Sequence, residues 1–95
     1  MIFINWNSEK NELLKKGRGF SFEIVAFQIE VENILDVLDH PNQDKYPGQR
    51  VFVIEFEEYA YFVPFIDNED EIFLKTIIPS RKATRDYLKW GNYGQ

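Results

Sequence analysis

The C-terminal third of the chain joins a strand to a helix across one proline, and this junction constrains the fold more than any other feature. Residues 72–78 alternate as a strand does. One face of that strand would hold Ile72, Leu74, Thr76 and Ile78. Pro79 cannot donate to a sheet and keeps the residue before it extended, and Ser80 can then cap a helix. The apolar stripe of that helix, which would pack on the sheet, consists of Ala83, Tyr87 and Trp90.

The remaining residues predict a chain of short elements ahead of this junction. In order, they are a strand at 2–4, a helix from Asn7 or Ser8 to Lys16 ended by Gly17, a helix at 22–30 capped by Ser21, a strand at 34–39, a loop at 40–49, strands at 51–56 and 59–66 joined by Glu57-Glu58, and a turn at 67–70. Alternation at 20–24 also fits the start of a strand, but the length of the segment favours a helix.

This order of elements predicts a single α+β domain over residues 1–95. We expect an antiparallel β-meander with two N-terminal helices and one C-terminal helix, all on one face of the sheet. Nine Phe, five Tyr and two Trp supply a substantial core for a chain of 95 residues.

Charge is segregated along the sequence. Residues 1–18 hold four cations and two acids, and residues 75–95 hold five cations and one acid. Residues 19–74 hold two cations against thirteen acids, which gives the net charge of −5. If the two ends of the chain meet, they form one cationic patch on an acidic body, and we expect the helix at 7–16 and the helix after Ser80 to do so.

The composition excludes several kinds of site. The chain has no cysteine and one histidine, so thiolate metal sites and cysteine nucleophiles are excluded, and no metal or cofactor is expected. The acids at 67–71 lack the spacing and glycine of a calcium loop. No apolar run is long enough for a membrane span, and the first six residues lack the features of a signal peptide, so a cytoplasmic protein without membrane contacts is expected.

The side chains that remain are sufficient for RNA cleavage without a metal. Arg81 and Arg85 lie one helical turn apart and can neutralise a phosphate, although a solvated helix face has the same composition. Tyr46 and Tyr61 can stack on exposed bases. His40 can transfer protons near neutral pH, or it can be a plain surface residue of its loop.

Each end of the chain carries a distinctive motif. The N-terminal motif runs from Trp6 to Asn11 and again from Lys15 to Glu23, and the C-terminal motif is Ile-Ile-Pro-Ser-Arg-Lys-Ala-Thr-Arg at 77–85. Both motifs resemble those of BrnT-type toxins. The family commonly has Lys-His-Gly where this chain has Lys-Gly-Arg-Gly at 16–19. The resemblance implies a RelE-like fold, a ribonuclease that blocks translation, and an antitoxin that often has a ribbon-helix-helix part.

The sequence therefore predicts the toxin of a type II toxin–antitoxin pair, a metal-independent endoribonuclease. In this hypothesis Arg81 and Arg85 neutralise the phosphate, and His40 or Glu55 transfers protons. The residues expected to contact the RNA backbone are Lys10, Lys16, Arg18 and Lys82. The expected partners are a cognate antitoxin and RNA, with the ribosome as a further candidate. The alternative is a non-catalytic interaction module whose acidic centre binds a basic protein.

Overall fold

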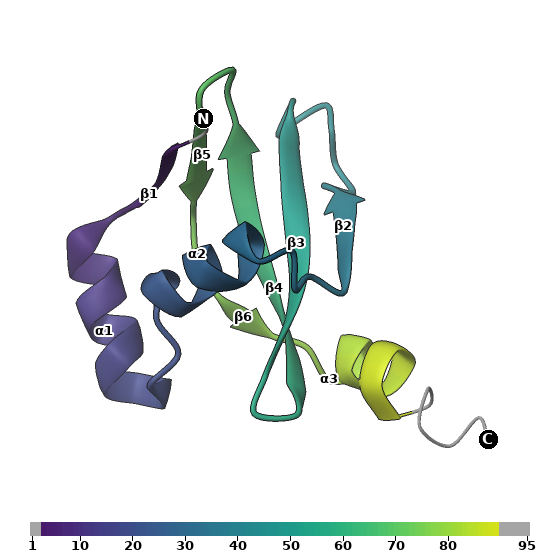
Figure 1. Cartoon of the computed structure of the whole chain (residues 1–95). Coiled ribbons are helices and arrows are strands. Elements are labelled where there is room, and N and C mark those ends of the chain that lie inside the picture. The colour runs from purple at the N-terminus through teal and green to yellow at the C-terminus, as the bar shows by residue number, and fades with distance from the viewer. Residues whose placement is uncertain (1–2, 90–95) are drawn as a thin grey trace.

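A computed structural model of the chain describes residues 3–89, and Figure 1 shows how its elements are arranged. In order, they are β1 (Phe3–Trp6), α1 (Ser8–Arg18), α2 (Phe22–Glu30), β2 (Asp36–Asp39), β3 (Gln49–Phe56), β4 (Tyr59–Asp67), β5 (Glu71–Leu74), β6 (Ile78–Pro79), α3 (Arg81–Ala83) and η1 (Thr84–Lys89), a π-helix that continues α3. The predicted α+β class is confirmed in this part of the chain, and the observed order of elements differs from the predicted one in that the strand at 72–78 is replaced by two strands, β5 and β6.

The strands form one mixed sheet in the order β1-β5-β4-β3-β2, with β6 paired to β4. Strands β2 to β5 form the predicted antiparallel meander. The prediction of a purely antiparallel sheet is wrong, because β1 joins β5 in parallel. A four-residue strand carries no sequence signal for its direction.

The predicted strand at 72–78 is divided into two. β5 ends at Leu74, and β6 begins at Ile78 and pairs with a different stretch of β4. Between them, the Lys75 N–H donates to the Pro64 carbonyl at 2.8 Å. Leu74 is buried whereas Ile78 is 45% exposed, so the predicted single face is wrong. Pro79 is the last residue of β6 and pairs with Tyr61 of β4, so the break before the helix comes directly after it.

Most helix ends follow the capping residues of the sequence. Asn7, Ser21 and Ser80 each accept a hydrogen bond from a backbone N–H of the first turn. The predicted end at Gly17 is wrong: α1 continues to Arg18, and Gly19 closes it with a φ of 75°. A glycine adopts this left-handed conformation without a steric cost, which is why the helix ends there.

The two faces of the sheet are covered by different helices. The α2 face, formed by Phe52, Ile54, Tyr61, Val63 and Phe65 of β3 and β4, packs against α2, Leu14 of α1 and the connecting residue Phe20. The opposite face, here called the η1 face, packs its Val53 and Ala60 against Ala83, Tyr87 and Leu88 of α3 and η1. The prediction of helices on one face is therefore wrong.

The C-terminal helix uses a different set of contact residues from the predicted stripe. The hydrogen bonding changes to the wider π-type at Thr84, and Leu88 joins Ala83 and Tyr87 on the sheet. Trp90, the third residue of the predicted stripe, lies outside the described residues.

Candidate functional site

The cationic segment α3–η1 is fixed to the sheet by one buried hydroxyl. Thr84 is 2% exposed, and its Oγ1 accepts from the Ala60 N–H and donates to the Ser80 carbonyl, both at 2.8 Å. The Ser80 N–H in turn donates to the Ala60 carbonyl at 3.0 Å. These bonds fix the start of the segment to the hairpin end of β4, so the cations that follow belong to a segment that is hydrogen-bonded to the sheet.

A second polar contact holds η1 to the edge strand β2. The Tyr87 hydroxyl donates to Asp36 Oδ2 at 2.5 Å, and the Val37 N–H donates to Asp36 Oδ1 at 2.8 Å. The bond from Tyr87, followed by that from Val37, holds the pKa of Asp36 below its ordinary value. The same bond raises the pKa of the Tyr87 hydroxyl, with burial adding to the shift.

The outer side of this segment carries exposed cations. Arg81, Lys82 and Arg85 are all exposed, and Arg85 Nε lies 3.6 Å from Asp86 Oδ1. Within residues 3–89, no ion pair holds Arg81 or Lys82. These two cations are therefore available to an anionic ligand.

Glu55 lies at the same end of the sheet as these cations. It is the direct cross-strand neighbour of Ala60, which places it on the η1 face, and its side chain is exposed. The structure thus brings together three of the predicted site residues, Arg81, Arg85 and Glu55, on one face.

The structure does not bring His40 to these residues. The His40 N–H donates to the Gln49 carbonyl at the far end of β3, a strand eight residues long. At about 3.3 Å per residue this separates His40 from the hairpin end by roughly 25 Å. His40 Nδ1 accepts from the Asn42 N–H at 3.0 Å, and its ring packs on Tyr46 at 4.4 Å. Both side chains thus stabilise the loop between β2 and β3.

Tyr61 is part of the core. It is 7% exposed and packs edge-on against Phe20, with the ring centroids 4.9 Å apart. Its ring has no free face for a base, so the prediction that it stacks on RNA is wrong. The alternation of β4 places residue 61 on the α2 face and residue 62 on the η1 face. The sequence alone does not show which of the two faces is covered at this position.

The predicted single cationic patch is also wrong. Lys10 and Lys16 are exposed on α1, which packs on the α2 face, whereas Arg85 belongs to the segment on the η1 face. The charge pattern did not show this, because it carries no information on which face each helix covers. The side chain of Arg18 lies outside the described part of the structure.

On the α2 face, Lys15 takes part in a structural network. Its Nζ lies 3.4 Å from carboxylates of both Glu12 and Glu23, and Glu23 also accepts from Asn11 at 2.9 Å. Burial lowers the pKa of Lys15, but the two carboxylates outweigh this and raise it overall. The hydrogen bond from Asn11 is the main cause that lowers the pKa of Glu23. Asn11 is buried and accepts from the Phe22 N–H, so the network joins α1 to α2.

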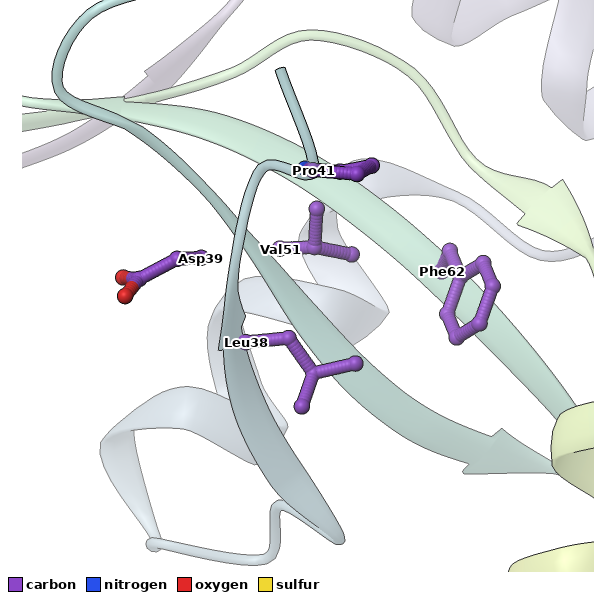
Figure 2. A pocket seen from close by; sticks show the side chains of 5 residues that line it. All are labelled: Leu38, Asp39, Pro41, Val51 and Phe62. Carbon is purple, nitrogen blue, oxygen red and sulfur yellow. The ribbon is translucent and has the colours of Figure 1, made fainter. Parts of the chain in front are cut away.

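The η1 face also contains an apolar groove that the sequence analysis missed. Its volume is about 490 Å³, and Figure 2 shows the lining side chains around it: Leu38, Asp39, Pro41, Val51 and Phe62. A signal was present, because residues 51–54 are all apolar, which is typical of a strand buried on both faces.

Other kinds of site have no support in the described residues. Between residues 3 and 89, no cluster of three His, Asp or Glu side chains is placed to hold a metal ion. The helices of this region are all too short or too polar to cross a membrane. Comparison with known proteins finds no matching family model, no similar curated protein and no similar solved structure.

Proposed function

We propose that the chain is the toxin of a type II toxin–antitoxin pair and a metal-independent endoribonuclease that inhibits translation. The observation that carries this proposal is the exposed set Arg81, Lys82 and Arg85 on a segment anchored by the buried Thr84. A segment anchored in this way suits electrostatic stabilisation, which requires that the charges are in place before the reaction begins. The resemblance of residues 77–85 to BrnT-type toxins supports the same conclusion.

Each of the residues gathered on the η1 face has a role in this reaction. Glu55 takes the proton from the 2′-hydroxyl, whose oxygen attacks the adjacent phosphorus. Arg81 and Arg85 neutralise the pentavalent phosphate, and Lys82 holds the flanking backbone. The bond from phosphorus to the 5′-oxygen breaks, and this oxygen takes a proton from water, which gives a 2′,3′-cyclic phosphate and a 5′-hydroxyl. The lysines of α1 would contact RNA only as a second, separate surface.

RNA cleavage with defined substrates tests this proposal. The purified chain should cleave an all-ribose RNA in the presence of EDTA and leave a 2′,3′-cyclic phosphate. A matched substrate with 2′-deoxyribose at the cleavage position should remain intact, because the nucleophile is missing. If the chain cleaves neither free RNA nor RNA on translating ribosomes, the assignment as a ribonuclease is wrong.

The acidic outer surface of α2 favours a second candidate, a non-catalytic module that binds a basic protein. Phe27 and Val31 are 63% and 53% exposed, one turn apart, beside the acids Glu30 and Glu32. No cation occurs between residues 19 and 44. This candidate predicts that a lysine-rich amphipathic peptide binds the chain and that Phe27→Ser weakens the binding, without any cleavage of RNA.

A further inference from the structure

The apolar groove is one part of a wider apolar surface on the η1 face. The pairing register places the following residues on this face beyond η1: Leu38, Val51, Pro64, Ile66 and Phe73. All five are apolar, whereas an antiparallel sheet with a solvated face normally alternates apolar and polar residues. Leu38 is 36% exposed and Ile78, beside Phe62, is 45% exposed. This half of the face has the composition of a buried surface, and no element among residues 3–89 covers it.

The groove and the exposed cations adjoin each other. Phe62 lines the groove and also packs on the cluster that contains Ala83, Tyr87 and Leu88. In Figure 2, Phe62 lies on the side of the groove toward the C-terminal helix. The outer side of that helix carries Arg81, Lys82 and Arg85 against one acid, Asp86.

The opposite side of the groove adds no free charge. Asp39 lies there, but its carboxylate points away from the other lining side chains in Figure 2, and its Oδ1 lies 3.6 Å from Arg50 Nε. The surface is therefore apolar in the middle and cationic toward α3. A ligand with a matching distribution would bind in a single orientation.

We propose that the groove and these three cations form one docking surface for an acidic amphipathic segment of a partner protein. An apolar side chain of the segment enters between Leu38, Val51 and Phe62, and its carboxylates pair with Arg81, Lys82 and Arg85. This deepens the proposed function and rests on it in one respect: a segment bound here covers the arginines assigned to the phosphate, so the partner is the antitoxin.

Charge complementarity is the reason for choosing this occupant. A nucleic acid alone would satisfy the cations but leave the apolar groove uncovered. A basic segment would place like charges beside α3, which is destabilising. Only a segment that combines apolar and acidic residues matches both halves of the surface.

Selection from a displayed library of random short peptides, with the purified full chain as bait, tests this chemistry. The recovered peptides should combine an apolar residue with Asp or Glu. Leu38→Glu and Arg81→Glu should each lower their affinity by about tenfold or more, since each puts a carboxylate where the peptide needs an apolar or cationic contact. The matched controls are Leu13→Glu and Lys10→Glu, which make the same changes at exposed positions of α1 and should leave the affinity unchanged.

Several outcomes would overturn the docking surface. They are recovery of basic peptides only, binding that is indifferent to Leu38→Glu, an equal effect of the α1 controls, self-association that blocks the groove in solution, and recovery of no binder at all. The proposed enzyme is judged separately, because Leu38→Glu should still cleave RNA at the wild-type rate. Acidic peptides that bind a chain without cleavage activity would leave the docking surface in place and remove the ribonuclease.

Discussion

The two faces of the sheet differ in how completely they are covered, and their chemistry differs accordingly. On the α2 face, Phe20, Phe22 and Val25 are fully buried, and Phe20 stacks on Phe56 at a centroid distance of 4.3 Å. On the η1 face, a short segment covers the hairpin end, and the other half holds an apolar groove that no helix or strand between residues 3 and 89 covers. The first face stabilises the fold, and the second holds the exposed groups that a ligand can reach.

The polar contacts follow the same division. The buried Asn11 joins α1 to α2, and its neighbours Lys15 and Glu23 form an ion pair. On the η1 face, Thr84 and Tyr87 are occupied, but Arg81 and Lys82 above them have no partner in the described residues. Side chains that bond to other groups of the protein are typical of a structural role, and exposed side chains without such partners are typical of a binding role.

The largest loss of stability is expected for a cavity on the α2 face. Phe22→Ala removes a fully buried ring that stacks on Trp6, and it should lower the free energy of unfolding by about 3–5 kcal/mol. Phe62→Ala, at a half-buried position of the η1 face, should cost clearly less. Urea denaturation of both variants measures the difference, and equal losses would contradict the contrast between the two faces.

A smaller loss is expected when the anchor of the cationic segment is removed. Thr84→Val leaves the Ala60 N–H without an acceptor in a buried site, and this should cost about 1–3 kcal/mol. Thr84→Ser retains the hydroxyl and serves as the control, with most of the stability kept. Hydrogen exchange at the Ala60 amide should accelerate in the Val variant, and unchanged exchange would show that the anchor is misassigned.

How far the sequence predicted the fold depended on the range of the interactions involved. Local signals succeeded: Ser21 and Ser80 cap the predicted helices, and Glu57 and Glu58 form the predicted turn with φ values of 53° and 66°. Such turns require two left-handed residues, which are usually Asn or Gly, so two glutamates there are uncommon. The direction of β1 and the break after Leu74 depend on distant partners, which a local pattern cannot show.

The candidate site was predicted in part for the same reason. Arg81, Lys82 and Arg85 follow a capping serine, and their exposure agrees with the predicted helix. The predictions for His40 and Tyr61 rest on residue type alone. The structure places His40 at the far end of β3 and Tyr61 in the core, because strand register decides both positions.

Removing the Tyr87 hydroxyl tests the contact between η1 and β2. The pKa of Asp36 is lowered in the folded state, so this carboxylate contributes stability above its ordinary pKa of 3.8 and loses it as the pH falls through the lower folded value. The pKa of Tyr87 is raised, so its contribution is present below its ordinary value of 10.0 and is lost above it. The free energy of unfolding of Tyr87→Phe should therefore differ most from that of the wild type between these two pH limits.

Denaturation midpoints of the two proteins across this pH range provide the measurement. The difference should be smaller than that caused by Thr84→Val and should close in acid. A difference that stays constant down to the acid limit would show that the carboxylate does not contribute.

The smallest effect on stability is expected at the rim of the groove. Leu38→Ser replaces a side chain that is 36% exposed and should change the free energy of unfolding by no more than about 0.5 kcal/mol. Thermal melting measures this change when the variant is compared with Leu13→Ser, which makes the same substitution at a more exposed position on α1. A loss comparable to that of Phe22→Ala would mean that the groove is a part of the core.

In the proposed ribonuclease, the cations of the η1 face, and not those of α1, act on the phosphate. The most direct test compares the RNA cleavage rates of two charge-matched double variants, Arg81→Ala with Arg85→Ala and Lys10→Ala with Lys16→Ala, at equal thermal stability. Loss of transition-state contacts should lower the rate of the arginine variant by about a hundredfold, or roughly 3 kcal/mol. The lysine variant should stay near the wild-type rate. Equal rates in the two variants, or a larger loss in the lysine variant, would contradict this account.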